Sequence, residues 1–425
     1  MSTAGFGEGT RRYVLGVLVV VYTTNFIDRQ ILSILLEPIK AELLLSDTQL
    51  GMLTGFAFAL FYATLGIPIA RFADRSNRRN VIALALTVWS AMTALSGLAQ
   101  NYWHLLAARI GVGVGEAGCS PPAHSMLSDY YPPERRATAL GIYSIGIPLG
   151  ILFGFSIGGW MAEIFGWRTA FFLVGVPGLL LALVMRFTVK EPVRGMSEGR
   201  TAAVDQPSIG ETVRTLWSRR SFRHLAFGGA LTAFVGYGWV TWMPSFLIRS
   251  HELGMGEAGT WLGLIFGIPG GIGIAVGGYL ADRLGGWDPR WYLWVVAVTL
   301  LLATPFAIGV FYAPTAAGAL VFLVFPVLLG NCYQATTFSQ TQGLVSLRMR
   351  AVAAAFLLFV LNIIGLGAGP QAVGIVSDLL ADRFGADSLR YSLLAFSFVN
   401  VWAAFHYWMA GRYLPADLAA ARAAH

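Results

Sequence analysis

The chain alternates between long apolar blocks and short polar loops. Each block holds about 20 or more residues, the length that a helix needs to cross the roughly 30 Å hydrocarbon core of a bilayer. Twelve such blocks can be marked out along the chain. They cover approximately residues 13–36, 48–70, 80–99, 102–127, 137–162, 168–188, 223–248, 258–281, 291–312, 316–345, 351–377 and 390–411. The pattern therefore predicts an all-α membrane protein with 12 transmembrane helices.

A long loop near the middle of the chain separates two sets of six blocks. We predict an N-terminal six-helix bundle over residues 1–188, a cytoplasmic linker over 189–222 and a C-terminal six-helix bundle over 223–425. The two halves echo each other, because Asp74-Arg75 after the second block returns as Asp282-Arg283 after the eighth. Parallel halves of six spans are typical of one large class of transporters, so the two bundles should be pseudo-symmetric.

The second part of the linker has the pattern of an amphipathic helix. Ser208 and Glu211 have the spacing of a helix-capping box. Ile209, Leu216 and Trp217 then fall on one face of the helix, away from the arginines. Such a helix suits the inner surface of a membrane, although a passive connector remains an equal alternative.

Composition supports a membrane protein and narrows its partners. Hydrophobic residues make up 56% of the chain and charged residues 12%, against about 25% charged in soluble domains. Most of the 29 lysines and arginines lie in loops on the side of the N-terminus. The positive-inside rule therefore places both termini in the cytoplasm and the protein in the plasma membrane, a bacterial inner membrane, and the net charge of +7 needs no nucleic-acid partner.

The chain shows no motif for a metal, a nucleotide or a covalent catalyst. Cys119 and Cys332 are the two cysteines, which excludes a disulfide framework and a CxxC metal site. There is no P-loop and no nucleophile motif. We therefore expect neither an enzyme nor a metal site, and no cofactor apart from a coupling proton.

Ionisable residues inside the first and fourth spans are the strongest candidates for function. Asn25, Asp28 and Arg29 lie in the first span, and Arg109 and Glu116 in the fourth. A charge at this depth costs at least about 2.5–3.5 kcal/mol, so such residues usually line an enclosed cavity, although an ion pair that only fixes helix packing is the alternative.

The depths of these residues predict which of them meet. At 1.5 Å per residue, Asp28 and Arg109 reach a similar height in the bilayer and should meet in a central cavity. Glu116 should lie deeper, without an obvious permanent partner. A carboxyl of that kind can be neutral at working pH, so we expect Glu116 and Asp28 to carry protons.

The loop after the second span carries a charged motif, Gly66-x-x-x-Ala70-Arg71-Phe72-Ala73-Asp74-Arg75-x-x-Arg78-Arg79. It resembles the loop signature between spans two and three of the major facilitator superfamily, with Asn77 in place of the usual second glycine. We expect Asp74 to lie at a helix N-terminus of the other half, and the arginines to pair with acidic residues that end nearby spans, such as Asp129. The predicted gating residues are Gly66, Asp74, Arg75, Arg78, Arg79, Asp129, Asp282 and Arg283.

Several motifs together resemble the spinster group of that superfamily. They are Asn25-Phe-Ile-Asp28-Arg29, Ser46-Asp-Thr-Gln-Leu-Gly51, Arg71-Phe-Ala-Asp74-Arg75-Ser-Asn-Arg78-Arg79 and Arg109-x-Gly-Val-Gly-x-Gly-Glu116-Ala117. The resemblance is strong over residues 22–150 and generic afterwards. It implies a proton-linked transporter of sphingosine-type lipids or lysophospholipids, with functional weight on Asp28, Arg109 and Glu116.

The C-terminal half offers a different surface to a substrate, because its spans carry no charged residue in their interiors. A substrate with a charged head and a long tail would match one charged half and one aromatic half, and arginine suits a phosphate head. The predicted substrate-binding residues are Asn25, Arg29, Arg109, Tyr237, Trp242, Tyr333, Gln334 and Asn362.

We therefore predict a proton-coupled secondary transporter of an amphiphilic lipid that works by alternating access. We expect it to be a monomer whose partners are the bilayer and the lipid or lysolipid substrate. A transporter of a small organic anion or drug is the first alternative. A membrane receptor without a transport cycle is the second.

Overall fold

The computed structural model describes residues 6–195 and 208–423, except for the side chains of Ile67, Ala70 and Asp74. Within these residues the chain is built from helices. The polar stretch predicted as a linker at residues 198–206 lies outside the described part. The amphipathic helix that should follow it is present as α11 (Ile209–Ser218), and the Ser208 hydroxyl accepts the Glu211 backbone N–H.

Two compact units divide the chain, and each includes a short segment from the opposite half of the sequence. Unit 1 contains Met1–Leu45, Ala57–Ala203 and Gly254–Gly263. Unit 2 contains Ser46–Phe56, Val204–Leu253 and Leu264–His425. Ser46–Phe56 thus groups with the C-terminal half of the sequence and Gly254–Gly263 with the N-terminal half, and the predicted bundle boundaries stay predictions.

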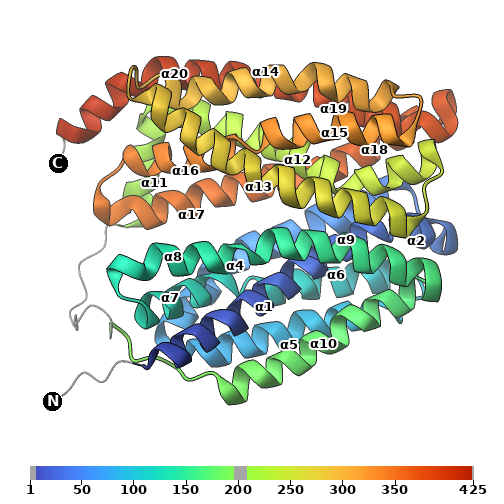
Figure 1. Cartoon of the computed structure of the whole chain (residues 1–425), viewed down its shortest axis with the longest axis horizontal. Helices are drawn as coiled ribbons and strands as arrows, with labels where there is room; N and C mark the ends of the chain where they lie inside the picture. Colours follow the sequence, from blue (N-terminus) through green and yellow to red (C-terminus); the bar gives the residue numbers. More distant parts are fainter. Residues whose placement is uncertain (1–5, 196–207, 424–425) are drawn as a thin grey trace. The chain divides into compact units, whose positions relative to one another are not determined.

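In the described residues, unit 1 contains nine complete helices, coloured from blue to green in Figure 1. They are α1 (Glu8–Ile34), α2 (Leu36–Leu43), α4 (Ala57–Arg75), α5 (Arg78–Ser96), α6 (Tyr102–Glu116), α7 (Ser120–Tyr130), α8 (Pro133–Ser144), α9 (Gly146–Phe165) and α10 (Trp167–Thr188), of which α2 is a short turn between spans.

A stripe of glycines brings α9 against α1. Gly146, Gly150, Gly154 and Gly158 recur every four residues, so they lie on one face of α9. A Cβ on Gly150 would lie 2.3 Å from Cβ of Phe26, which is closer than two carbon atoms can approach. Small residues at this spacing let membrane helices pack backbone to backbone. The stripe therefore determines where α1, which carries Asp28 and Arg29, lies in unit 1.

Unit 2 contains the remaining helices, which run from yellow-green to red in Figure 1 except for α3, which is blue. They are α3 (Asp47–Gly51), α12 (Arg220–His251), α13 (Met255–Gly285), α14 (Trp291–Tyr312), α15 (Ala316–Gly330), α16 (Tyr333–Gly343), α17 (Arg350–Leu361), α18 (Gly369–Phe384), α19 (Ser388–Ser397) and α20 (Val399–Ala423), together with α11. The first residues of α13 belong to unit 1.

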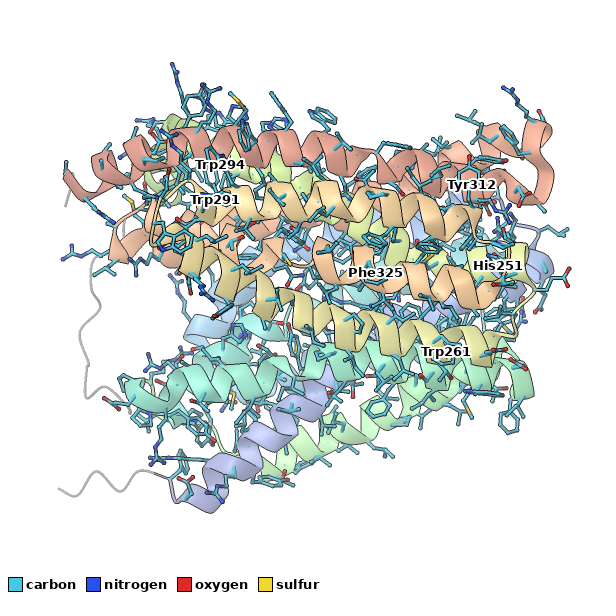
Figure 2. All side chains as sticks on the ribbon, turned by 45° about the horizontal axis from the view of Figure 1, so that its top comes forward. His251, Trp261, Trp291, Trp294, Tyr312 and Phe325 are labelled. Atoms are coloured by element: carbon cyan, nitrogen blue, oxygen red, sulfur yellow. The ribbon has the colours of Figure 1, made fainter. Side chains whose placement is uncertain are left out.

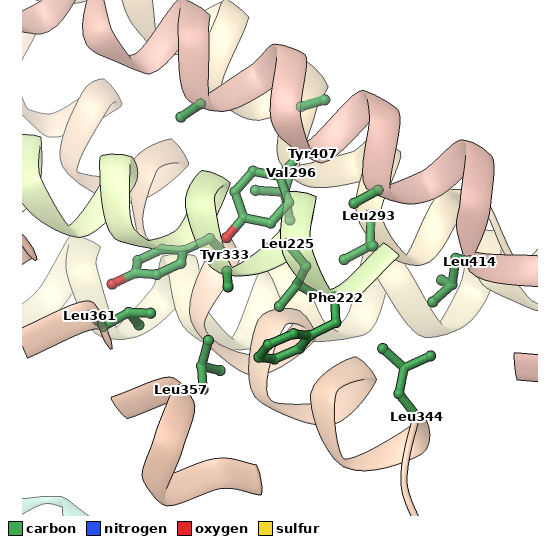
Figure 3. Packing of buried hydrophobic residues seen from close by; sticks show 14 of the residues in the cluster. Phe222, Leu225, Leu293, Val296, Tyr333, Leu344, Leu357, Leu361, Tyr407 and Leu414 are labelled. Atoms are coloured by element: carbon green, nitrogen blue, oxygen red, sulfur yellow. The ribbon is translucent and has the colours of Figure 1, made fainter. Parts of the chain in front are cut away.

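The interior of unit 2 is a hydrophobic cluster centred on α12. Figure 3 shows Phe222 and Leu225 of α12 beside Leu357 and Leu361 of α17 and Tyr407 of α20. The Tyr407 hydroxyl and the Thr337 hydroxyl lie 2.7 Å apart and form a hydrogen bond. A buried tyrosine normally needs such a partner for its polar end, so the pair fixes α20 against α16.

Two π-helical segments interrupt unit 2 and pack against each other. They are η1 (Met52–Phe56), between α3 and α4, and η3 (Asn362–Ala368), between α17 and α18. A Cβ on Gly55 would lie 2.7 Å from the Gly367 carbonyl oxygen, so the two backbones are in close contact. π-Helical turns are rare and are frequently found at functional sites.

Nine helical stretches of the described chain are long and apolar enough to cross a membrane. The last of these, Leu347–Ala423, has 77 residues and holds two of the predicted spans. Two other predicted spans are not among these stretches. The span predicted at 80–99 is α5, which is less apolar because it begins with Arg78-Arg79-Asn80. The span predicted at 102–127 is interrupted, because α6 ends after 15 residues. The predicted all-α membrane fold is confirmed, and its predicted spans match helices or runs of consecutive helices.

Aromatic side chains mark both ends of a typical span. Figure 2 shows Trp291 and Trp294 at one end of α14 and Tyr312 at the other. The helix has 22 residues, which is about 33 Å at 1.5 Å per residue. Tryptophan and tyrosine are enriched at the two membrane–water interfaces, so α14 has the length and the ends of a transmembrane helix.

Candidate functional site

A buried ion pair joins the first and fourth spans within unit 1. The Arg29 Nε atom donates to the Glu116 Oε2 atom at 2.6 Å. The Glu116 side chain is fully buried and that of Arg29 is 14% exposed. A hydrogen bond between two ionised groups is short and strong, and here it connects α1 to α6.

Three aromatic rings surround the other side of the Arg29 guanidinium. Its central carbon lies 5.0 Å from the centre of the Phe26 ring, 5.2 Å from that of Phe58 and 4.6 Å from that of Tyr62. The Arg109 guanidinium lies 5.4 Å from the same Phe58 ring. These are cation–π distances, so the aromatic faces partly replace water around both cations.

Asp28 and Arg109 are neighbours, as their predicted depths indicated. The Arg109 Nη1 atom lies 3.5 Å from the backbone carbonyl oxygen of Asp28, the limit of a hydrogen bond. Asp28 is fully buried. Both of its carboxyl oxygens lack a hydrogen-bond partner among the described residues. The predicted side-chain pair is therefore replaced by a contact to the main chain.

The prediction that Glu116 has no permanent partner is wrong, because Arg29 occupies that position. The depth argument compared only residues at the same height. It did not consider that Arg29 projects about 100° around the helix from Asp28 and has a long side chain. The carboxyl that lacks a hydrogen bond is that of Asp28 instead.

Helix α5 contributes a polar group that sequence reasoning missed. Trp89 and Thr93 lie next to the Asp28 carboxyl, one helical turn apart. Both side chains, with Ser90 between them, are buried. The available signal was three polar-capable side chains within five residues of an otherwise apolar span.

These residues form one cluster, which we call the unit 1 charge cluster: Asn25, Asp28, Arg29, Trp89, Thr93, Arg109 and Glu116. It holds two carboxyl groups and two guanidinium groups, so the charges balance when all four are ionised. Both Asn25 side-chain polar atoms also lack partners among the described residues. The cluster therefore has the means to bind an anion and to take up a proton.

Arg78 organises a second ion-pair network, beside the loop after the second span. Its guanidinium donates to Asp129 at 2.5 Å and to Glu191 at 2.8 Å. It also donates to the Ser125 hydroxyl and the Pro192 carbonyl oxygen. The predicted pairing of this loop with Asp129 is thus confirmed for Arg78, and Glu191 is an additional partner that sequence reasoning missed.

The other residues proposed for gating have fewer contacts. Arg79 contacts Glu191 through its backbone N–H at 2.8 Å. Arg75 is exposed, and a Cβ on Gly66 would meet no atom within 4 Å. The Asp74 side chain lies outside the described part. In the second half Asp282 and Arg283 are exposed, and Arg283 donates to the Tyr279 hydroxyl. The gating roles of these residues stay predictions.

The predicted substrate residues of the C-terminal half are mostly packed inside unit 2. Trp242 is fully buried, and its indole N–H donates to the Pro370 carbonyl oxygen at 2.8 Å. Tyr333 belongs to the hydrophobic cluster, and Tyr237 packs against its edge. The Nε2 atom of Gln334 lies 3.5 Å from the Oδ1 atom of Asn331, and Asn362 is the first residue of η3. Their binding roles stay predictions.

The fold is that of a secondary transporter, a class of protein in which ionisable side chains inside membrane spans commonly lie on ion or substrate pathways. The family model of the Major Facilitator Superfamily matches residues 18–370. A protein described as an MFS-type efflux pump, from Mycolicibacterium smegmatis, is 37% identical over 95% of this chain and 94% of its own length. The chain belongs to the Major Facilitator Superfamily and, within it, to the spinster group.

Further relatives support the group assignment. Protein spinster homolog 1 of Xenopus laevis is 28% identical over 93% of this chain and 80% of its own length. The crystal structure of a bacterial homolog of the human lysosomal transporter Spinster, inward-facing and unoccupied, aligns with a TM-score of 0.87 and 33% identity over 97% of this chain and 99% of that chain. The hexuronate transporter of Bacillus subtilis is 28% identical over 89% of this chain and 90% of its own length.

Proposed function

We propose that this transporter couples the movement of protons to that of an amphiphilic lipid with an anionic head, a lysophospholipid or a sphingosine-phosphate-like molecule. The observation that carries the proposal is the Asp28 carboxyl. It is fully buried, Arg109 contacts its backbone carbonyl oxygen, and the donors beside it, Trp89 and Thr93 of α5, are neutral groups. A fully buried carboxylate whose neighbouring donors are neutral is unfavourable, so a proton is favoured there in some step of the cycle.

The Arg29–Glu116 pair gives the coupling a physical basis. A proton on Glu116 removes the charge that holds the Arg29 guanidinium. Arg29 then turns to a substrate phosphate, with Arg109 close by on the same Phe58 ring. A proton on Asp28 removes the second negative charge that would repel the phosphate. Each proton that crosses the membrane supplies about 2.3 kcal/mol per 100 mV, enough to bias a transport cycle.

Two observations support a lipid as the substrate. The rings of Phe26, Phe58 and Tyr62 lie against Arg29, so an apolar surface adjoins the cations. The chain also belongs to the spinster group, and two of the four motifs that resemble that group, at residues 25–29 and 109–117, contain residues of the unit 1 charge cluster. We place the protein in a bacterial inner membrane, as a monomer with both termini cytoplasmic and with no cofactor apart from the proton.

A small organic anion or drug is the second candidate. The M. smegmatis relative is described as an efflux pump and the B. subtilis relative as a hexuronate transporter. Two arginines beside aromatic rings would also suit an aromatic or carboxylated small molecule.

Flux into proteoliposomes tests the proposal directly. Purified protein should move a labelled lysophospholipid faster when a pH gradient is imposed than without one, and a short-chain organic anion should not compete. Asp28→Asn and Glu116→Gln should each abolish the response to the gradient, and Arg109→Gln should abolish transport. Arg12→Gln removes an exposed arginine that pairs with Glu8, and it should leave transport unchanged.

Three results decide between the alternatives. Flux of the labelled short-chain anion, with no lysolipid flux, favours the second candidate. Absence of any flux supports a receptor without a transport cycle. Lysolipid flux that responds to acidity in all three cluster variants would refute the assignment of coupling to this cluster.

A further inference from the structure

A basic cavity lies in unit 2, between the first turn of α12 and the last turns of α20. It has a volume of about 330 Å³ and is lined by Arg220, Arg223, His224 and Tyr413. This volume is at the lower end of the range for sites that hold small molecules. Nothing in the transport proposal uses these residues, since the charge cluster belongs to unit 1.

The walls of the cavity are held in place by contacts between α12 and α20. The Asp417 carboxylate accepts from the Ser221 backbone N–H at 2.7 Å and from its hydroxyl at 2.6 Å. The Nδ1 atoms of His224 and His406 are 3.0 Å apart, so one imidazole donates to the other. The Tyr413 ring stacks on His224, with 5.9 Å between ring centres.

The two arginines that line the cavity have no ion-pair partner in the described ranges 6–195 and 208–423. The Arg220 guanidinium lies 5.7 Å from the Tyr413 ring, a cation–π contact that leaves its N–H donors available to a ligand. Arg223 is exposed. The carboxylate of Asp417, four residues after Tyr413 in α20, already accepts the two hydrogen bonds from Ser221. The cavity therefore presents uncompensated positive charge.

An exposed aromatic surface adjoins the cavity. The His406 ring lies 5.7 Å from the ring of Phe227, 6.0 Å from that of Trp402 and 5.7 Å from that of Phe405. These three residues are about half exposed, at 46%, 58% and 54%. In multi-pass membrane proteins tryptophan is enriched at the level of the lipid headgroups, so the exposed Trp402 places this surface near that level. The cavity thus lies beside surface that lipid chains cover.

We propose that this cavity binds the phosphate of an anionic phospholipid headgroup, and that the acyl chains of this lipid lie over Phe227, Trp402 and Phe405. Guanidinium groups pair with phosphate oxygens through two parallel hydrogen bonds, which makes arginine well suited to this ligand. Basic pockets between transmembrane helices bind anionic headgroups in this way. This lipid stays bound to unit 2 and is not the transported substrate, so the proposal does not depend on which substrate is transported.

Native mass spectrometry of the full-length protein tests the site. Protein stripped of lipid is titrated with phosphatidylglycerol or with phosphatidylcholine, and the lipid-bound fraction is measured. The wild type should prefer phosphatidylglycerol. The double variant Arg220→Gln/Arg223→Gln should bind it at least about tenfold more weakly, with phosphatidylcholine binding unchanged. Arg220→Lys/Arg223→Lys keeps the charge and should retain an intermediate affinity.

The matched control removes the same charge elsewhere. Arg186→Gln/Arg214→Gln alters two exposed arginines that do not line the cavity, and it should bind phosphatidylglycerol like the wild type. Inorganic phosphate at millimolar concentration separates the two sources of phosphate. If it displaces phosphatidylglycerol completely, or if the control variant loses as much binding as the cavity variant, the lipid site is overturned. Equal binding by the wild type and the cavity variant would overturn it as well.

Discussion

Arg249 and Asp47 form a two-point ion pair inside unit 2. The two terminal nitrogens of the guanidinium donate to the two carboxylate oxygens, at 2.7 and 2.8 Å. Asp47 is 1% exposed and also accepts from the Ser377 hydroxyl at 2.6 Å. The carboxylate of Asp378 accepts the backbone N–H groups of Asp47 and Thr48, which begin α3. The start of the second span is thereby attached to helices of the C-terminal half of the sequence.

Asp47→Asn should destabilise the protein by about 3–5 kcal/mol, because it leaves the largely buried Arg249 without its charged partner. The double variant Asp47→Asn/Arg249→Gln should be less destabilised than the sum of the two single variants. Thermal unfolding in detergent measures all three. As a control, Arg390→Gln breaks the more exposed pair with Asp387 and should change stability by less than about 1 kcal/mol. Additive effects at Asp47 and Arg249 would contradict the role of the pair.

Arg78→Gln should be strongly destabilising, by about 3–5 kcal/mol, because Asp129 and Glu191 would then face each other with no cation between them. Arg135→Gln is the control, since it removes an exposed arginine whose ion pair is with Glu8. Hydrogen exchange of residues 189–195 reports the effect, and exchange there should accelerate in Arg78→Gln alone. Equal acceleration in both variants would mean that the guanidinium of Arg78 is not what holds this segment.

The sequence predicts what depends on hydropathy and on spacing along one helix, and it fails where a side chain from one helix meets another. The twelve apolar blocks match helices because each must satisfy its own backbone within the bilayer. The contact between Asp28 and Arg109 follows from depth alone. The pair of Arg29 with Glu116 does not, since it depends on the rotation of α1 against α6. The contact of Glu191 with Arg78 could not be predicted from the sequence either, because it depends on how the chain turns after the sixth span.

Gly150→Ala should destabilise unit 1 by about 1–3 kcal/mol through overpacking. The added Cβ would lie 2.3 Å from Cβ of Phe26 and 2.7 Å from the Thr23 carbonyl oxygen, so α9 must move away from α1. Gly141→Ala on α8 is the control, because a Cβ there meets no atom within 4 Å, and it should be neutral or slightly stabilising. Thermal unfolding of both variants checks the prediction, and equal melting temperatures would show that the stripe tolerates a wider spacing.

Acidification should weaken one contact in unit 1, between the end of α2 and the start of α10. Glu42, at the end of α2, accepts from the Arg168 guanidinium and from the Trp167 indole N–H, and these hydrogen bonds lower the pKa of the Glu42 carboxyl. Because this pKa is lower in the folded than in the unfolded chain, the contact stabilises the protein above the unfolded value, and the stabilisation is lost as the pH falls through the folded value. Glu42→Gln should therefore lower the melting temperature in detergent at pH 7 and leave it unchanged well below the folded pKa. Trp167→Phe, which removes one donor, should show a smaller difference of the same sign. A Glu42→Gln protein that melts like the wild type at every pH would contradict the assignment of this acid sensitivity to Glu42.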